Sequence, residues 1–157
     1  MRLNEPRIQP LHEDNWTEEQ NTIFRGQKMR GEVQNIFRVL ANHEKLAKRW
    51  LVFGNHILSK STLPPRDREI VILRTGWLCQ SEYEWSQHVH IARRAGMTDE
   101  EIARIKEGAH ADGWTEHERW LITATDELRN DAFISDETWN GLKQTWTDQQ
   151  MMDLVFT

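Results

Sequence analysis

An all-α, single-domain protein is the fold class that this sequence predicts. Four threonines each stand three positions before a Glu or Gln, which is the pattern of the helix capping box. The four pairs are Thr17 with Gln20, Thr98 with Glu101, Thr115 with Glu118, and Thr147 with Gln150. Gly96 and Gly108 follow helix-forming segments and suit the left-handed position after a helix end. So many helix starts and stops in 157 residues leave little chain for a sheet.

The expected elements follow one another along the chain. Residues 1–16 contain Pro6 and Pro10 and predict an extended lead-in, and residues 17–157 predict one helical domain. Within that domain we expect helices at about residues 17–30, 33–41, 43–60, 65–79, 81–95, 98–107, 115–129, 135–144 and 147–156.

The segment after Pro64 and Pro65 is open to two interpretations. Its apolar run, Ile70 to Leu73, is mostly β-branched and fits a buried strand. The two prolines suit a helix start, and an element apolar on most faces must be buried. We therefore expect a central helix here.

Composition and charge exclude several classes of protein. A net charge of −5 disfavours nucleic-acid binding, because phosphates attract a basic surface. No apolar run reaches transmembrane length, and Met1 to Trp16 lacks an apolar signal core, so we expect a cytoplasmic protein without membrane contact. The lone Cys79 predicts neither an internal disulfide nor a thiolate metal site, and is interpreted as a small, half-buried apolar residue.

Four residues form the best candidate for a catalytic site. Ser81, Glu84 and His88 are spaced by three and then four residues, which places them on one helix face. Glu69 lies on the preceding helix, near the start of this one. A carboxylate beside an imidazole can orient it for general acid–base catalysis. Two other readings stay open: a structural Glu–His pair, and a metal site formed by His88, Glu69 and Glu84.

Other residues around this cluster are candidates for substrate binding. Arg74, one turn beyond Glu69, would supply a cation for an anionic group, or else form a structural salt bridge with Glu69 or a neighbour. Tyr83, Trp77 and Trp85 flank the cluster and would line an apolar pocket, although core packing explains them equally well.

The same stretch resembles the carboxymuconolactone decarboxylase family, in the superfamily of AhpD-like alkylhydroperoxidases. Peroxidase members of that superfamily carry a Glu, eleven residues, and then Cys-x-x-Cys-x-x-x-His. This sequence has Glu69, eleven residues, and then Ser81-x-x-Glu84-x-x-x-His88. The flanking segments, Leu63 to Glu69 and Ala92 to Thr98, are also similar to the family. The resemblance extends from about Phe37 to the end of the chain.

The resemblance implies an AhpD-like helical bundle that assembles as a trimer or hexamer, with no metal and no other cofactor. Since Ser81 and Glu84 replace the two redox cysteines, dithiol peroxidase activity is not expected. We expect instead an acid–base enzyme, a lyase of aromatic-compound catabolism, that acts on a small unsaturated lactone or keto acid. His88 would transfer the proton, Glu69 would orient it, Glu84 would be a second carboxyl, and Ser81 would donate a hydrogen bond.

Two alternatives remain: peroxidase activity that uses Cys79, and a non-catalytic, ligand-binding oligomer. Family members usually continue with one more helix, so we also expect that Thr157 is not the natural end of the C-terminal helical region.

Overall fold

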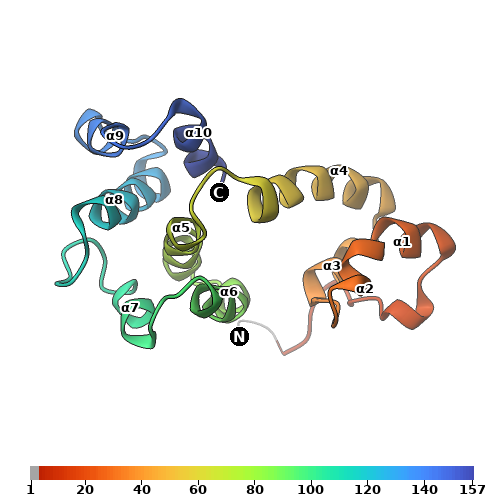
Figure 1. Cartoon of the computed structure of the whole chain (residues 1–157). Coiled ribbons are helices and arrows are strands. Elements are labelled where there is room, and N and C mark those ends of the chain that lie inside the picture. The colour runs from red at the N-terminus through yellow and green to blue at the C-terminus, as the bar shows by residue number, and fades with distance from the viewer. Residues whose placement is uncertain (1–3) are drawn as a thin grey trace. The chain divides into compact units, whose positions relative to one another are not determined.

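The computed structural model describes residues 4–157, and over that range it contains helices and turns but no strand (Figure 1). The all-α fold class predicted from the sequence is confirmed. The chain divides into two compact units, one ending at Lys60 and the other comprising Ser61–Thr157. Across the described residues, no helix combines the length and apolar character needed to cross a membrane.

The first unit is built from short helices around an aromatic core. Its elements are η1 (Glu13–Asn15), α1 (Glu18–Ile23), α2 (Arg25–Met29), α3 (Asn35–Leu40), α4 (Glu44–Asn55) and the π-helical turn η2 (His56–Lys60). Phe24 is fully buried, with its ring centroid 5.0 Å from that of Trp16 and 6.3 Å from that of Phe37. Arg38 pairs with Glu13 through two hydrogen bonds of 2.8 and 3.0 Å.

The sequence prediction is wrong about two helices in this unit. The helix expected over residues 17–30 is divided at Phe24, whose backbone dihedrals of φ −100° and ψ 14° interrupt α1 before α2 begins. Gly26 lies just beyond the break and weakens helix continuation. The helix expected over residues 43–60 is α-helical only to Asn55 and then changes to the wider π form.

The second unit contains the longer helices and follows the sequence prediction closely. Its elements are α5 (Pro65–Leu78), α6 (Glu82–Arg94), α7 (Asp99–Arg104), α8 (Glu116–Asp131), α9 (Asp136–Lys143) and α10 (Asp148–Phe156). The run from Ile70 to Leu73 is helical, so the strand alternative is wrong. All four capping boxes form, and Gly96 and Gly108 have positive φ angles of 89° and 97°.

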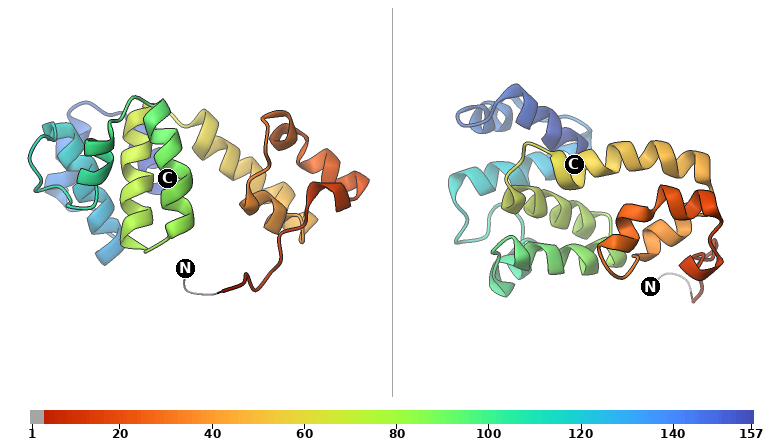
Figure 2. Two further views of the ribbon diagram at one scale, coloured as in Figure 1. Left: turned by 90° about the horizontal axis from the view of Figure 1, so that it is seen from below. Right: turned by 45° about the vertical axis from the view of Figure 1, so that its right-hand side comes forward.

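Helix α5 lies at the centre of this unit. Ile70 and Leu73 are fully buried, and their core continues through Leu121 and Ile122 of α8. Helices α5 and α6 lie side by side, as both views of Figure 2 show, and α5 also packs on α8. Because α5 is enclosed in this way, its polar side chains can remain stable only with partners inside the protein.

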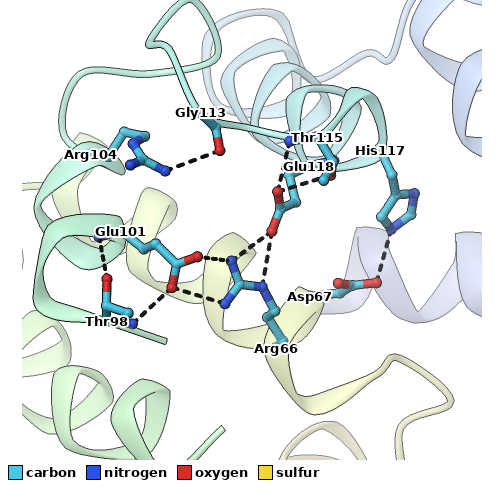
Figure 3. A network of polar contacts seen from close by, with 9 residues as sticks. All are labelled: Arg66, Asp67, Thr98, Glu101, Arg104, Gly113, Thr115, His117 and Glu118. Carbon is cyan, nitrogen blue, oxygen red and sulfur yellow. Dashed lines mark hydrogen bonds and ion pairs between the residues drawn. The ribbon is translucent and has the colours of Figure 1, made fainter. Parts of the chain in front are cut away.

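One of those polar side chains, Arg66, joins the starts of three helices (Figure 3). Its guanidinium donates to Glu101 of α7 at 2.6 and 3.1 Å and to Glu118 of α8 at 2.8 and 2.9 Å. These two carboxylates are also the capping-box residues of their own helices. The capping boxes therefore help to pack α5, α7 and α8 together.

This network alters the ionisation of both carboxyl groups. The hydrogen bonds from Arg66 hold the pKa of Glu101 below its usual value. Burial opposes ionisation of Glu118, but hydrogen bonds from the Thr115 backbone and from Arg66 outweigh it and lower its pKa as well. Carboxyl groups with a lowered pKa in the folded state stabilise the fold at any pH above their unfolded pKa, and that contribution is lost as the pH falls through the folded pKa.

We predict that Arg66→Met lowers the free energy of unfolding by about 2–3 kcal/mol at pH 7, because it removes hydrogen bonds between charged groups that are partly buried. Below about pH 4.3, the usual pKa of Glu, the variant should lose less stability on further acidification than the wild type. Urea unfolding at several pH values measures both effects.

Arg93→Met provides the matched control. The Arg93–Asp99 pair, at 2.8 Å, is also formed by an arginine and an acidic residue at a helix start, but both side chains are exposed. The Arg93→Met substitution should lower the free energy of unfolding by at most about 1 kcal/mol. If both variants lose the same free energy of unfolding, the Arg66 network does not stabilise the fold more than an exposed ion pair does.

Candidate functional site

The site is organised around a carboxylate that is completely removed from solvent. Glu69 of α5 has 0% exposure, and one of its oxygens, Oε2, lies 2.7 Å from Nδ1 of His88 on α6. Its other oxygen accepts a 3.0 Å hydrogen bond from Nε of Arg68. The sequence frame predicted that Glu69 and His88 would meet, and the packing of α5 against α6 brings them into contact.

The contact with Glu69 orients the imidazole. An ionised carboxylate only accepts hydrogen bonds. Beside an ionised Glu69, His88 donates its Nδ1–H to the carboxylate. Its Nε2 is then the nitrogen available to take up or release a proton.

Glu84 lies on the same helix as His88, toward its N-terminal end, and Ser81 immediately precedes that helix. A carboxylate oxygen of Glu84 lies 3.7 Å from Nε2 of His88, which is an ion-pair distance but too long for a direct hydrogen bond. The Glu84 side chain is 45% exposed, so it stands between the buried imidazole and solvent. Ser81 is the residue before α6, and its hydroxyl does not cap the helix.

The corner between α5 and α6 positions this pair of helices. Gln80 has a left-handed backbone with φ 54°, although it is not a glycine. The N–H of Gln80 donates to the carbonyl of Trp77 at 3.0 Å, and that of Ser81 donates to the carbonyl of Gly76 at 2.9 Å. This is the Schellman arrangement of a helix end. It allows α6 to begin immediately beside the end of α5.

Arg74 is not part of this cluster. Its guanidinium forms a bidentate pair with Asp126 of α8, with distances of 2.6 and 2.9 Å, and donates to the carbonyls of Ile105 and Lys106. The geometry therefore favours the structural salt bridge, with Asp126 as the partner, over the substrate-binding role. Arg68 contacts Glu69 instead. Sequence reasoning missed Arg68, because adjacent helix residues are not expected to face each other.

The three aromatic candidates differ in solvent exposure. Trp77 is 44% exposed, whereas Tyr83 and Trp85 are half-buried. The rings of Trp77 and Trp85 meet edge to face with centroids 5.9 Å apart, and Trp85 also packs against the core. Cys79 is exposed at the end of α5. Across residues 4–157, no three His, Cys, Asp or Glu side chains are grouped so that they could hold a metal ion.

Comparisons with known proteins agree with this fold. The model of the carboxymuconolactone decarboxylase family matches residues 44–127. Among solved structures, an alanine variant of the debrominase Bmp8 in complex with 2,3,4-tribromopyrrole has a TM-score of 0.79 at 16% identity, covering 98% of this chain and 82% of the debrominase. An AhpD-core, peroxidase-related protein from Ralstonia eutropha JMP134 also has a TM-score of 0.79, at 17% identity, covering 97% of this chain and 83% of its own. A search of curated protein sequences finds no significant match.

We predict that Gln80→Gly raises the free energy of unfolding by about 1 kcal/mol, because glycine adopts a left-handed conformation without steric cost. Thermal or urea unfolding measures the change. Gln87→Gly, in the middle of α6, is the control and should destabilise by about 1 kcal/mol. A loss of stability at both positions would show that the corner is not strained.

Proposed function

This chain belongs to the carboxymuconolactone decarboxylase family, and from that premise we propose that it is a cofactor-free acid–base enzyme acting on a small unsaturated lactone or keto acid. The observation that carries the proposal is the buried contact of 2.7 Å between Glu69 and His88. Such a contact holds an imidazole in one orientation, which is what a general acid–base residue requires.

In the proposed reaction, the bond between carbon and a carboxylate group breaks and carbon dioxide leaves. The electron pair of that bond is delocalised onto a carbonyl oxygen as an enolate. Nε2 of His88 then gives its proton to the carbon, and the imidazole is reprotonated from solvent. Glu69 stabilises the imidazolium, Ser81 donates a hydrogen bond to the enolate oxygen, and Glu84 exchanges protons between His88 and water.

The local charges are compatible with an anionic substrate. Two carboxylates in one site would repel such a substrate, but the charge of Glu69 is balanced by Arg68. Of these two carboxylates, Glu84 is the one that is partly exposed to solvent.

A thiol peroxidase is the second candidate function, because the AhpD-core relative is named as peroxidase-related. The only cysteine, Cys79, is exposed at the end of α5, two positions before the frame residue Ser81. A reaction there would need a second thiol from another molecule to resolve the sulfenic acid. For this reason we favour proton transfer.

We also propose that the protein forms a homo-oligomer, as a trimer or a hexamer. Helix α10 exposes Met152, Val155 and Phe156, which are between 47% and 62% accessible. Apolar side chains grouped at one helix are typical of subunit contacts. A non-catalytic, ligand-binding oligomer would share this feature. A measurement of activity therefore distinguishes that hypothesis from the proposed enzyme.

We predict that His88→Gln lowers kcat by about 10²–10⁴-fold, the usual contribution of a general acid–base residue. The substrate panel contains unsaturated lactone acids, keto acids and, because of the debrominase relative, a brominated pyrrole, followed by ultraviolet absorbance. Glu69→Gln should also reduce kcat, and the double variant should lose little more than either single variant, since residues acting as one unit are not additive.

His90→Gln is the control for that experiment, because His90 is exposed on the same helix two residues away. It should retain wild-type activity. Full turnover in folded His88→Gln would exclude the proposed mechanism, and the absence of turnover across the panel in the wild type would favour the non-catalytic oligomer.

We predict that Cys79→Ser leaves turnover of the lactone or keto acid unchanged, since the exposed thiol at the end of α5 is not part of the proposed acid–base pair of Glu69 and His88. Peroxide consumption with a dithiol donor is assayed in parallel. Peroxide turnover by the wild type that disappears in Cys79→Ser would instead support the peroxidase reading.

A further inference from the structure

A lysine lies over two tryptophans beside the candidate site. The ammonium of Lys106, in the turn after α7, is 5.2 Å from the ring centroid of Trp77 and 4.9 Å from that of Trp85. Both distances are within the range of cation–π attraction. The two rings come from different helices, so the ammonium is held at the junction of α5, α6 and the turn after α7.

The backbone that carries this lysine is fixed from the interior. Arg74 donates to the carbonyl of Ile105 at 2.8 Å and to that of Lys106 at 3.2 Å. The same guanidinium is held by Asp126. Lys106 therefore has an exposed side chain on an anchored backbone, which reduces the entropy lost when a ligand binds to it.

The charge of Lys106 is not neutralised by a carboxylate. None of the ion pairs found among residues 4–157 includes it, although acidic residues outnumber basic residues in the chain by 25 to 20. An aromatic face attracts a cation without cancelling its charge. The ammonium thus remains available to a negatively charged group.

One of the two tryptophans under the lysine is a helix neighbour of the proton-transferring residue His88. Trp85 directly follows Glu84 in α6, and it precedes His88 by three residues. Residues three apart on a helix are neighbours on its surface. A small molecule that touches the Trp85 ring is therefore within one helical turn of the imidazole.

We propose that Lys106, supported by Trp77 and Trp85, binds the anionic group of the substrate and selects planar anions over their neutral analogues. This inference rests on the proposed function for its location beside His88. It gives to Lys106 the charge-binding role that the sequence suggested for Arg74, whose guanidinium is fully engaged with Asp126 and two carbonyls. Trp77, which is 44% exposed, would contact the unsaturated, planar part of the molecule.

The test is calorimetric binding of two probes to the full chain: sorbate, a planar unsaturated carboxylate, and sorbamide, its neutral amide. The wild type should bind sorbate more tightly than sorbamide. Lys106→Gln should weaken sorbate binding about five- to tenfold and leave sorbamide binding unchanged, while Lys106→Arg should retain the preference for the anion. Lys143→Gln, which removes a lysine paired with Asp148, is the matched control and should change neither affinity.

The inference fails if wild-type protein does not prefer sorbate, or if folded Lys106→Gln binds sorbate as the wild type does. It can be separated from the proposed function through His88→Gln, which should bind sorbate normally. If His88→Gln keeps full turnover while Lys106→Gln loses sorbate affinity, the proton-transfer mechanism is wrong and the anion site stands. If His88→Gln loses turnover while Lys106→Gln binds normally, the mechanism stands and the anion site is wrong.

Discussion

The structure of the candidate site depends on a carboxylate that is fully buried in the central helix α5. Removing the charge of Glu69 from water costs several kcal/mol unless neighbouring groups compensate for it. Arg68 and His88 provide that compensation from two sides, one from the same helix and one from α6. One of these partners, His88, belongs to a different helix. The packing of α5 against α6 is therefore needed both to stabilise the buried charge and to form the acid–base pair.

The sequence predicted the helical parts of the fold because they are encoded locally. Each capping box needs only residues three positions apart, and all four are present in the structure. The break at Phe24 was not predictable in this way. It depends on the burial of that ring between Trp16 and Phe37, which is a contact between distant segments of the first unit.

The candidate site was likewise predictable only in part. The spacing of Glu69, Glu84 and His88 anticipated their proximity, because it matches a family frame that places two helices together. The partners of the arginines were not evident. Arg74 pairs with Asp126, which is 52 residues away in the sequence, and no local pattern indicates that contact. The position of Lys106 over Trp77 and Trp85 likewise follows from how α5, α6 and α7 pack.

The pairing of Arg74 with Asp126 has a consequence for how this chain can evolve. Arg74 is 8% exposed and supports the backbone of Lys106, so loss of the Asp126 charge would leave a buried and uncompensated guanidinium. Substitutions at these two positions are therefore expected to occur together among related sequences. If the two positions vary together, the identity of a residue in α8 depends on the candidate site. This would hold although α8 contributes no residue to that site.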